Sequence, residues 1–128
     1  MLFQNRYKDM KQIRRLFLIL CFSLAAASSV SAGPIRPTDA SHYVGKKVTV
    51  TGKVSQVHTD KRSGVTFINM GGRYPANVFT GVIFRDYIGQ FPQVHSLEGR
   101  AVSITGTVML YKGKPEIILR DKAQLTRP

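Results

Sequence analysis

The chain has 128 residues, 43% of them hydrophobic and 20% charged, which suits one small globular domain with its own apolar core. Its 19 basic and seven acidic residues give a formal net charge of +12, which indicates a polyanionic partner or a negatively charged surface. Solubility alone is the other interpretation of this charge. With one cysteine, the chain excludes an intramolecular disulfide framework.

Residues 1–32 have the pattern of a secretory signal of the bacterial Sec type. Basic residues occur between positions 6 and 15, an apolar run follows over residues 16–27, and small residues fill positions 28–32. We expect cleavage after Ala32 and a periplasmic or secreted product. An uncleaved membrane anchor is the alternative, disfavoured because the apolar run falls short of the roughly 20 residues of a stable span.

Removal of the signal would leave residues 33–128, with 14 basic and six acidic residues and a net charge of +8. The only cysteine, Cys21, would be lost with the signal. The apolar core must therefore stabilise this segment without disulfides, even in an oxidising compartment.

The expected elements begin with a proline-containing leader and a short helix within residues 33–43, capped by Thr38 or Asp39 and followed by Gly45. Residues 46–58 then alternate between apolar and polar side chains, which predicts a strand. Val57 falls out of phase with the earlier valines, so we expect a β-bulge near Ser55 and Gln56.

Four more strands are expected along the rest of the chain. β-Branched and aromatic residues favour strands over 65–70 and 77–84, and alternation favours a strand over 100–111 with Val102, Ile104, Val108 and Leu110 facing inward. A fifth strand is expected over 115–120. Between the third and fourth strands, residues 85–97 have near-helical apolar spacing interrupted by glycine and proline, which predicts a short, imperfect helix.

One internal similarity points to a barrel. Residues 45–54 and 99–108 share a pattern with a glycine in the middle of a strand, Gly52 in one copy and Gly106 in the other. A single repeat is too sparse for a solenoid. A glycine inside a strand permits the sharp coil that a small barrel requires.

Five strands, a helix between the third and fourth, and glycines in the first and fourth resemble the OB-fold, an all-β, five-stranded Greek-key barrel. The likeness covers residues 44–125 within an expected domain of residues 44–128. More narrowly, residues 45–54 followed by 65–71 look like the anticodon-binding OB domains of aspartyl-type aminoacyl-tRNA synthetases, and are similar to small exported proteins with a single OB domain.

This resemblance implies a nucleic-acid-binding surface. It implies that Phe67 stacks on a base and that Asn69 lies beside it, able to bond a base edge. The chain departs from the synthetase pattern at Gly71 and Gly72, where those domains usually carry an Arg-Asp pair, so we expect little sequence preference.

Strand alternation supports the same role for Phe67. If Thr66, Ile68 and Met70 face the core, Phe67 is exposed on the opposite face and available to a base, although packing under a loop remains the alternative. For Phe79 the alternation of residues 77–84 leaves open which face is inside.

Cations cluster in the loops that flank the ligand groove of an OB barrel, and tyrosines beside them offer further stacking platforms. Five cations on five phosphates give a salt slope of about 3.5, at about 0.7 for each phosphate of a single strand. The candidate nucleic-acid-binding residues are Phe67, Asn69, Lys61, Arg62, Arg73, Tyr74, Phe79, Tyr111, Lys112 and Lys114.

No catalytic set stands out, so we expect a non-enzymatic protein without a metal or cofactor. The histidines His42, His58 and His95 lack ligand spacing, and the six acidic residues after residue 32 are dispersed, which disfavours a secreted nuclease of the staphylococcal type. The expected partner is single-stranded DNA or RNA. The alternative is a structural role in the cell envelope, with an acidic protein, glycan or lipid head group as partner.

Overall fold

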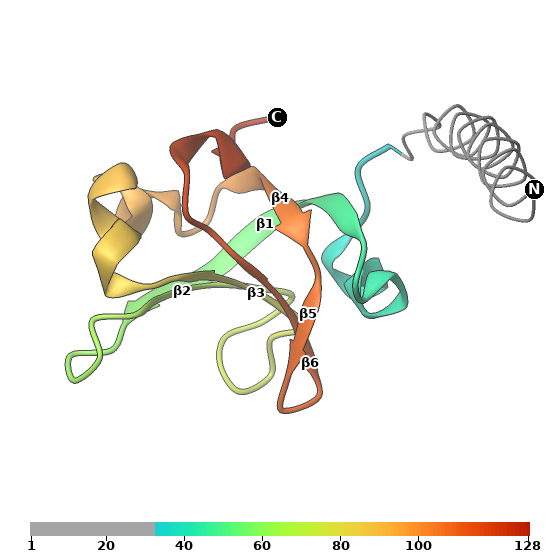
Figure 1. The fold of residues 1–128 in the computed structure, drawn as a ribbon, viewed down its shortest axis with the longest axis horizontal. Coiled ribbons are helices and arrows are strands. Elements are labelled where there is room, and N and C mark those ends of the chain that lie inside the picture. Colours follow the sequence, from blue (N-terminus) through green and yellow to red (C-terminus); the bar gives the residue numbers. More distant parts are fainter. Residues whose placement is uncertain (1–32) are drawn as a thin grey trace, which may run out of the picture. The chain divides into compact units, whose positions relative to one another are not determined.

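The computed structural model describes residues 33–128, which form one compact unit. The predicted signal sequence lies outside the described residues. Figure 1 shows short 3-10 helices around a strongly curved sheet. The elements are η1 (Pro37–Tyr43), β1 (Lys47–Thr59), β2 (Thr66–Met70), β3 (Phe79–Ile83), η2 (Arg85–Gln90), η3 (Val94–Leu97), β4 (Ala101–Thr107), β5 (Met109–Tyr111), β6 (Lys114–Ile118), η4 (Lys122–Gln124) and β7 (Leu125–Thr126).

The seven strands form one mixed sheet in the order β5-β6-β3-β2-β1-β4-β7. Every neighbouring pair is antiparallel except β3 and β6, which run parallel. This confirms the all-β class. Seven strands are present where five were expected, because the predicted fourth strand is divided in two and β7 is added at one end of the sheet order.

The division of the predicted fourth strand occurs at Val108. Up to Thr107 the chain pairs with β1, whereas from Met109 it pairs with β6. Val108 bonds across the junction, donating its N–H to the Lys46 carbonyl at 3.0 Å and accepting from Gly45 at 2.8 Å. The predicted fourth strand is therefore two strands, β4 and β5, that join opposite parts of the sheet.

The bulge predicted in the first strand is confirmed. The register between β1 and β2 shifts between Val54 and Gln56, so both Val54 and Val57 are buried in the core. The same shift leaves Gln56 and His58 on the opposite face, where the candidate binding site lies. The Ser55 hydroxyl accepts a hydrogen bond from Gly72 at 3.0 Å, which connects the bulge to the loop after β2.

Several sequence expectations about the ends of elements need correction. Helix η1 begins at Pro37 after Arg36, without a side-chain cap, because proline already has the φ angle of a first helical residue. Asp39 pairs instead with Arg36 at 3.3 Å. Leu110, expected to face inward, is 53% exposed, because β5 belongs to a hairpin that extends past the core.

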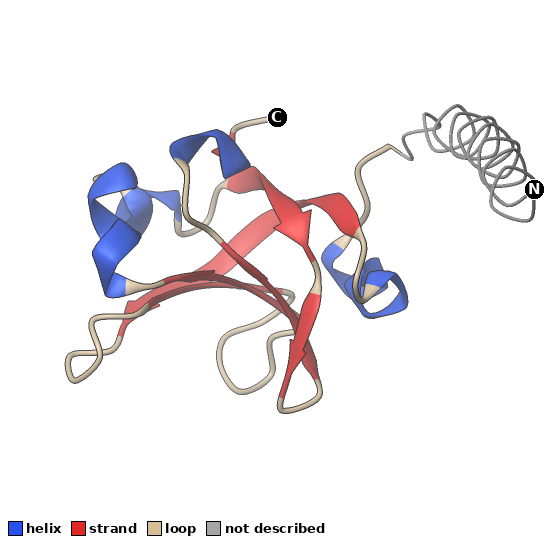
Figure 2. Cartoon of the chain, viewed as in Figure 1, coloured by secondary structure: helices blue, strands red, loops and turns tan. Residues whose placement is uncertain are grey.

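The imperfect helix expected over residues 85–97 is present as two 3-10 helices, η2 and η3, which Figure 2 shows in blue outside the strands. Phe91, Val94 and Leu97 from this segment are buried against the sheet. No helix within residues 33–128 has the length and apolar character needed to cross a membrane.

The two mid-strand glycines are needed for close approach between segments. A Cβ atom at Gly106 would lie 2.5 Å from Cγ2 of Ile117, and one at Gly52 would lie 2.5 Å from Cγ of Pro37. Neither glycine has a positive φ angle. Gly106 thus lets β4 pack on β6, although the two strands are not hydrogen-bonded neighbours.

Replacing Gly106 by alanine is expected to lower the free energy of unfolding by about 1–3 kcal/mol, because the added methyl group must displace Ile117. Urea denaturation measures this change. Gly89→Ala is the matched control, since no atom lies within 4 Å of a Cβ at that position, and its effect should stay within about 0.5 kcal/mol. Equal stability of the two variants would contradict the close packing of β4 on β6.

Candidate ligand-binding groove

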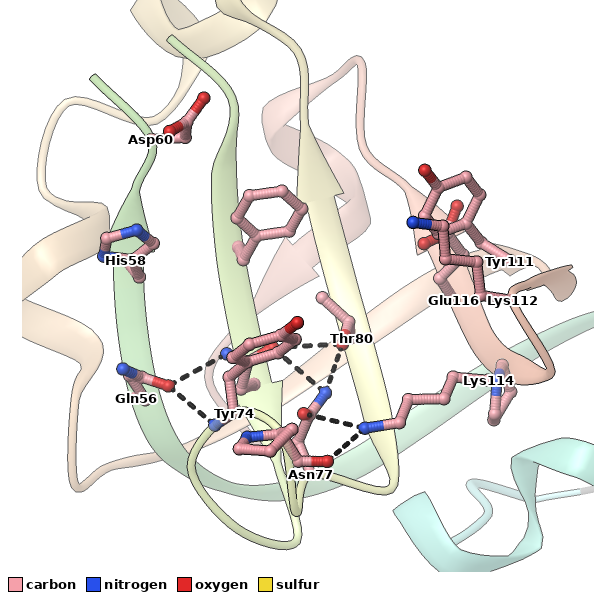
Figure 3. Close-up of a pocket in the computed structure, with 14 residues that line it drawn as sticks. Gln56, His58, Asp60, Tyr74, Asn77, Thr80, Tyr111, Lys112, Lys114 and Glu116 are labelled. Carbon is pink, nitrogen blue, oxygen red and sulfur yellow. Dashed lines mark hydrogen bonds between the residues drawn. The ribbon is translucent and has the colours of Figure 1, made fainter. Parts of the chain in front are cut away.

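A groove of about 690 Å³ lies on the face of β1, β2 and β3 opposite the core. The β2–β3 loop and the β5–β6 hairpin extend it, and Figure 3 shows side chains from these segments directed into it. The groove is lined by Gln56, His58, Asp60, Phe67, Asn69, Tyr74, Pro75, Asn77, Thr80, Tyr111, Lys112, Lys114, Pro115 and Glu116.

Phe67 provides the aromatic floor of the groove. Its neighbours Thr66 and Ile68 are fully buried on the core face, as alternation along β2 requires, so the Phe67 ring faces the groove. The ring is half-buried, between His58 on β1 and Val82 on β3 in the strand register. The prediction that Phe67 lies opposite the core is confirmed, with less exposure than expected.

A buried hydrogen-bond network lies next to Phe67. Asn77 donates from Nδ2 to Oγ1 of Thr80 at 2.7 Å and to Oδ1 of Asn69 at 3.2 Å. The Thr80 hydroxyl donates to the same Asn69 oxygen at 3.0 Å. Asn69 in turn donates to Oε1 of Gln56 at 3.1 Å, and that oxygen also accepts from the backbone N–H of Tyr74 at 2.9 Å.

The network assigns a structural role to Asn69. This side chain is 3% exposed, and both its amide oxygen and its amide nitrogen have partners within the protein. The resemblance implied that Asn69 could bond a base edge. In the structure its polar atoms are already used within the protein, so it is not free to do so. It connects β2 to the loop that carries Tyr74 and Asn77.

Two tyrosine–lysine pairs lie at the edges of the groove. Tyr74 and Tyr111 are 75% and 60% exposed. The ammonium of Lys114 lies 5.8 Å from the Tyr74 ring centre, and that of Lys112 lies 5.5 Å from the Tyr111 ring centre. Lys114 also donates to the Pro75 carbonyl and, at 3.4 Å, to Oδ1 of Asn77, so it connects the hairpin to the β2–β3 loop.

The structure thus brings together six of the ten candidate residues: Phe67, Asn69, Tyr74, Tyr111, Lys112 and Lys114. Of the other four, Lys61 and Arg62 are exposed in the β1–β2 loop, outside the groove lining. Phe79 is fully buried in the core, which removes it as a contact for a ligand.

Arg73 is engaged in an ion pair away from the groove. Its Nη1 lies 3.0 Å from Oε1 of Glu98, whose Oε2 accepts from the backbone N–H of Val57 at 3.2 Å. The Val57 N–H and the Arg73 guanidinium hold the pKa of Glu98 below its ordinary value. The charge of Arg73 is therefore already paired with a carboxylate.

The groove also contains two carboxyl groups that the sequence analysis did not select, Asp60 and Glu116. Hydrogen bonds from the hydroxyl and backbone N–H of Ser63, at 2.7 and 2.9 Å, hold the pKa of Asp60 below its ordinary value. Burial instead raises the pKa of Glu116. With Lys112 and Lys114, these two carboxylates give the lining a net charge of zero when His58 is neutral.

Sequence reasoning missed the other polar residues of the lining for an identifiable reason. Gln56 and His58 reach the groove face only because of the bulge, and a bulge was expected there, so their position was available to inference. Asn77, Thr80 and Glu116 had no comparable signal, since the pairing of β3 with β6 joins segments more than 30 residues apart. Within residues 33–128, no group of three or more His, Cys, Asp or Glu side chains is placed to hold a metal ion.

No protein-family model matches the chain, and no curated protein sequence matches it. Among solved structures, OBody AM2EP06 bound to hen egg-white lysozyme is similar, with a TM-score of 0.51, 17% identity, and coverage of 72% of this chain and 89% of that one. OBody AM1L10 bound to hen egg-white lysozyme gives a TM-score of 0.52, 18% identity, and coverage of 68% and 86%. The chain has an OB-like fold.

A structure described as an aspartyl-tRNA synthetase from Leishmania major Friedlin is also similar, with a TM-score of 0.48 and 13% identity. The likeness covers 73% of this chain and 21% of that one. At 17% and 18% identity, the two OBody structures establish the OB-like fold and nothing about the ligand.

Replacing Thr80 by valine is expected to lower the free energy of unfolding by about 1–3 kcal/mol, because the buried amide oxygen of Asn69 and the buried amide nitrogen of Asn77 each lose one of their hydrogen-bond partners. Thr107→Val is the matched control, because Thr107 is an exposed strand residue, and should change stability by less than about 0.5 kcal/mol. Chemical denaturation of both variants tests the network, which predicts that only Thr80→Val is destabilised.

Proposed function

We propose that this chain is an exported, non-enzymatic binding module that holds an extended single strand of DNA or RNA in the groove, with little sequence preference. The observation that carries the proposal is the set of three aromatic side chains around one groove, Phe67 on its floor and Tyr74 and Tyr111 at its edges, with a lysine over each tyrosine.

Stacking explains how such a groove binds without selecting a sequence. An aromatic ring contributes about 1–3 kcal/mol for each stacked base and accepts every base, since each has a π-face. The buried network supports low selectivity, because the polar atoms of Asn69 and Thr80 are used inside the protein. Few fixed donors and acceptors are then left on the floor to read a base edge.

Charge in the groove favours a modest phosphate contribution. Two lysines line it, instead of the five cations first expected. Two phosphate contacts to a single strand give a salt slope of about 1.4, which corresponds to about a sevenfold loss of affinity between about 50 and 200 mM salt. Most of the affinity would therefore come from stacking.

Fluorescence anisotropy with labelled single strands tests the proposal. Phe67→Ala should weaken binding by about 5- to 150-fold, the equivalent of one lost stacking contact, with the salt slope left near 1.4. Phe84→Ala is the matched control, because Phe84 is an exposed phenylalanine outside the groove lining, and its affinity should equal that of the wild type. Failure of the wild type to bind any single strand at about 50 mM salt would contradict the proposal.

A second candidate, an uncharged glycan, is favoured by the balance of two lysines and two carboxylates in the groove. OB-fold surfaces also bind oligosaccharides, and a neutral groove does not repel them. Heparin and a neutral oligosaccharide, used as competitors in the same titration, separate the candidates. Displacement by the neutral oligosaccharide with a salt slope near zero would favour the glycan.

Export rests on the sequence of residues 1–32. When the full chain is expressed in a bacterial host, we expect the soluble periplasmic or secreted product to begin at Gly33, with cleavage after Ala32. Intact mass spectrometry measures this directly. A full-length mass confined to the membrane fraction would support the retained anchor instead.

A further inference from the structure

The ionisable side chains of the groove come from three places. β1 and the residue after it contribute His58 and Asp60, and the β5–β6 hairpin contributes Tyr111, Lys112, Lys114 and Glu116. β2 and β3 supply Phe67, Asn69 and Thr80, which carry no charge, and the β2–β3 loop adds Tyr74. An anionic strand that enters the groove thus meets two carboxylates as well as two lysines.

The two carboxylates differ in what surrounds them. Asp60 accepts two hydrogen bonds from Ser63, which stabilise its charged form. The Glu116 side chain is half-buried on β6, opposite Thr80 on β3 and Met109 on β5, and within residues 33–128 it takes part in no hydrogen bond or ion pair. Among the described residues, neither Lys112 nor Lys114 forms a salt bridge with Glu116. Of the two carboxylates, Glu116 therefore has the less stabilised charge.

Resting on the proposed function, we infer that the groove takes up protons when it binds an anionic single strand, so that affinity rises as the pH falls from about 7.5 to about 5. The geometry that carries this inference is the placement of Glu116 and His58 in the same groove as Lys112 and Lys114.

Glu116 supplies the first part of the effect. Because burial raises the pKa of Glu116, this carboxyl group binds its proton at a higher pH than an exposed glutamate does. Protonation removes a negative charge that repels phosphates, and a bound phosphate favours the protonated form further. Asp60, whose pKa is lowered, keeps its charge through the same range and contributes little to the change.

His58 supplies the second part. It is exposed, lies opposite Phe67 in the register of β1 and β2, and faces the groove. Histidine is the side chain that commonly gains a positive charge between about pH 8 and pH 5. An imidazolium here adds a third cation beside the aromatic floor. The lining carries a charge of zero with Glu116 ionised and His58 neutral, and of +2 with a proton on each of them.

The experiment measures the affinity of the purified protein for a labelled thymine single strand at several pH values and constant ionic strength. Thymine strands are chosen because neither their bases nor their phosphodiesters titrate in this range. We expect wild-type affinity to rise about tenfold between about pH 7.5 and about pH 5, as expected for two changes of charge at groove distances. Circular dichroism at each pH checks that the fold is intact.

Variants divide the effect between the two groups. Glu116→Gln should bind more tightly than the wild type at about pH 7.5 and retain about a threefold gain at low pH, while Glu116→Gln with His58→Gln should show no gain. Asp86→Asn and His42→Gln are matched controls. They remove one carboxylate and one histidine at exposed sites outside the groove, and should keep the tenfold gain.

A flat profile for the wild type, or a Glu116→Gln profile equal to that of the wild type, would overturn the inference. If thymine strands bind at about pH 7.5 in a manner that depends on Phe67, the proposed function stands even when the profile is flat. Absence of binding at every pH would remove both the inference and the proposed function.

Discussion

The hydrogen bonds among Asn69, Asn77 and Thr80 hold the candidate groove in shape. They connect two neighbouring strands to the β2–β3 loop, which carries Tyr74, and Lys114 extends the connection to the β5–β6 hairpin. All three side chains are less than 9% exposed, so a missing partner would leave a polar group unsatisfied in a buried place. The aromatic edges of the groove therefore depend on a polar interior that does not itself face a ligand.

Two long-range contacts position the β5–β6 hairpin, which forms one edge of the groove. At Val108 the strand that pairs with the chain changes from β1 to β6. Gly106, two residues earlier, lets β4 pack closely on Ile117. Together they determine where the β5–β6 hairpin leaves the core, beside the β2–β3 loop, as Figure 1 shows. Tyr111 and Lys112, both on this hairpin, line the groove.

The sequence predicted those features that depend on neighbouring residues along the chain. Alternation placed Phe67 opposite the core, and the phase change at Val57 located the bulge, because both depend on residues adjacent in sequence. The sequence could not show that Phe79 is buried, since the alternation of β3 fits either face until its neighbours are known. Likewise, the pairing of Arg73 with Glu98 and the place of Glu116 depend on contacts between distant segments.

The positive net charge of residues 33–128 is not concentrated in the groove. Residues 33–128 carry +8, yet the groove lining is neutral when His58 is uncharged, so most of the excess cations lie on other surfaces. Those cations attract any polyanion over a distance of about one Debye length, roughly 8 Å at physiological salt, without selecting it. Under the proposed function, selection is assigned to the groove, where stacking would favour ligands with planar rings and the carboxylates would oppose phosphates that approach too closely. Attraction and recognition are thus assigned in this proposal to different residues, and under it a variant that changes the surface charge alone should leave recognition in the groove intact.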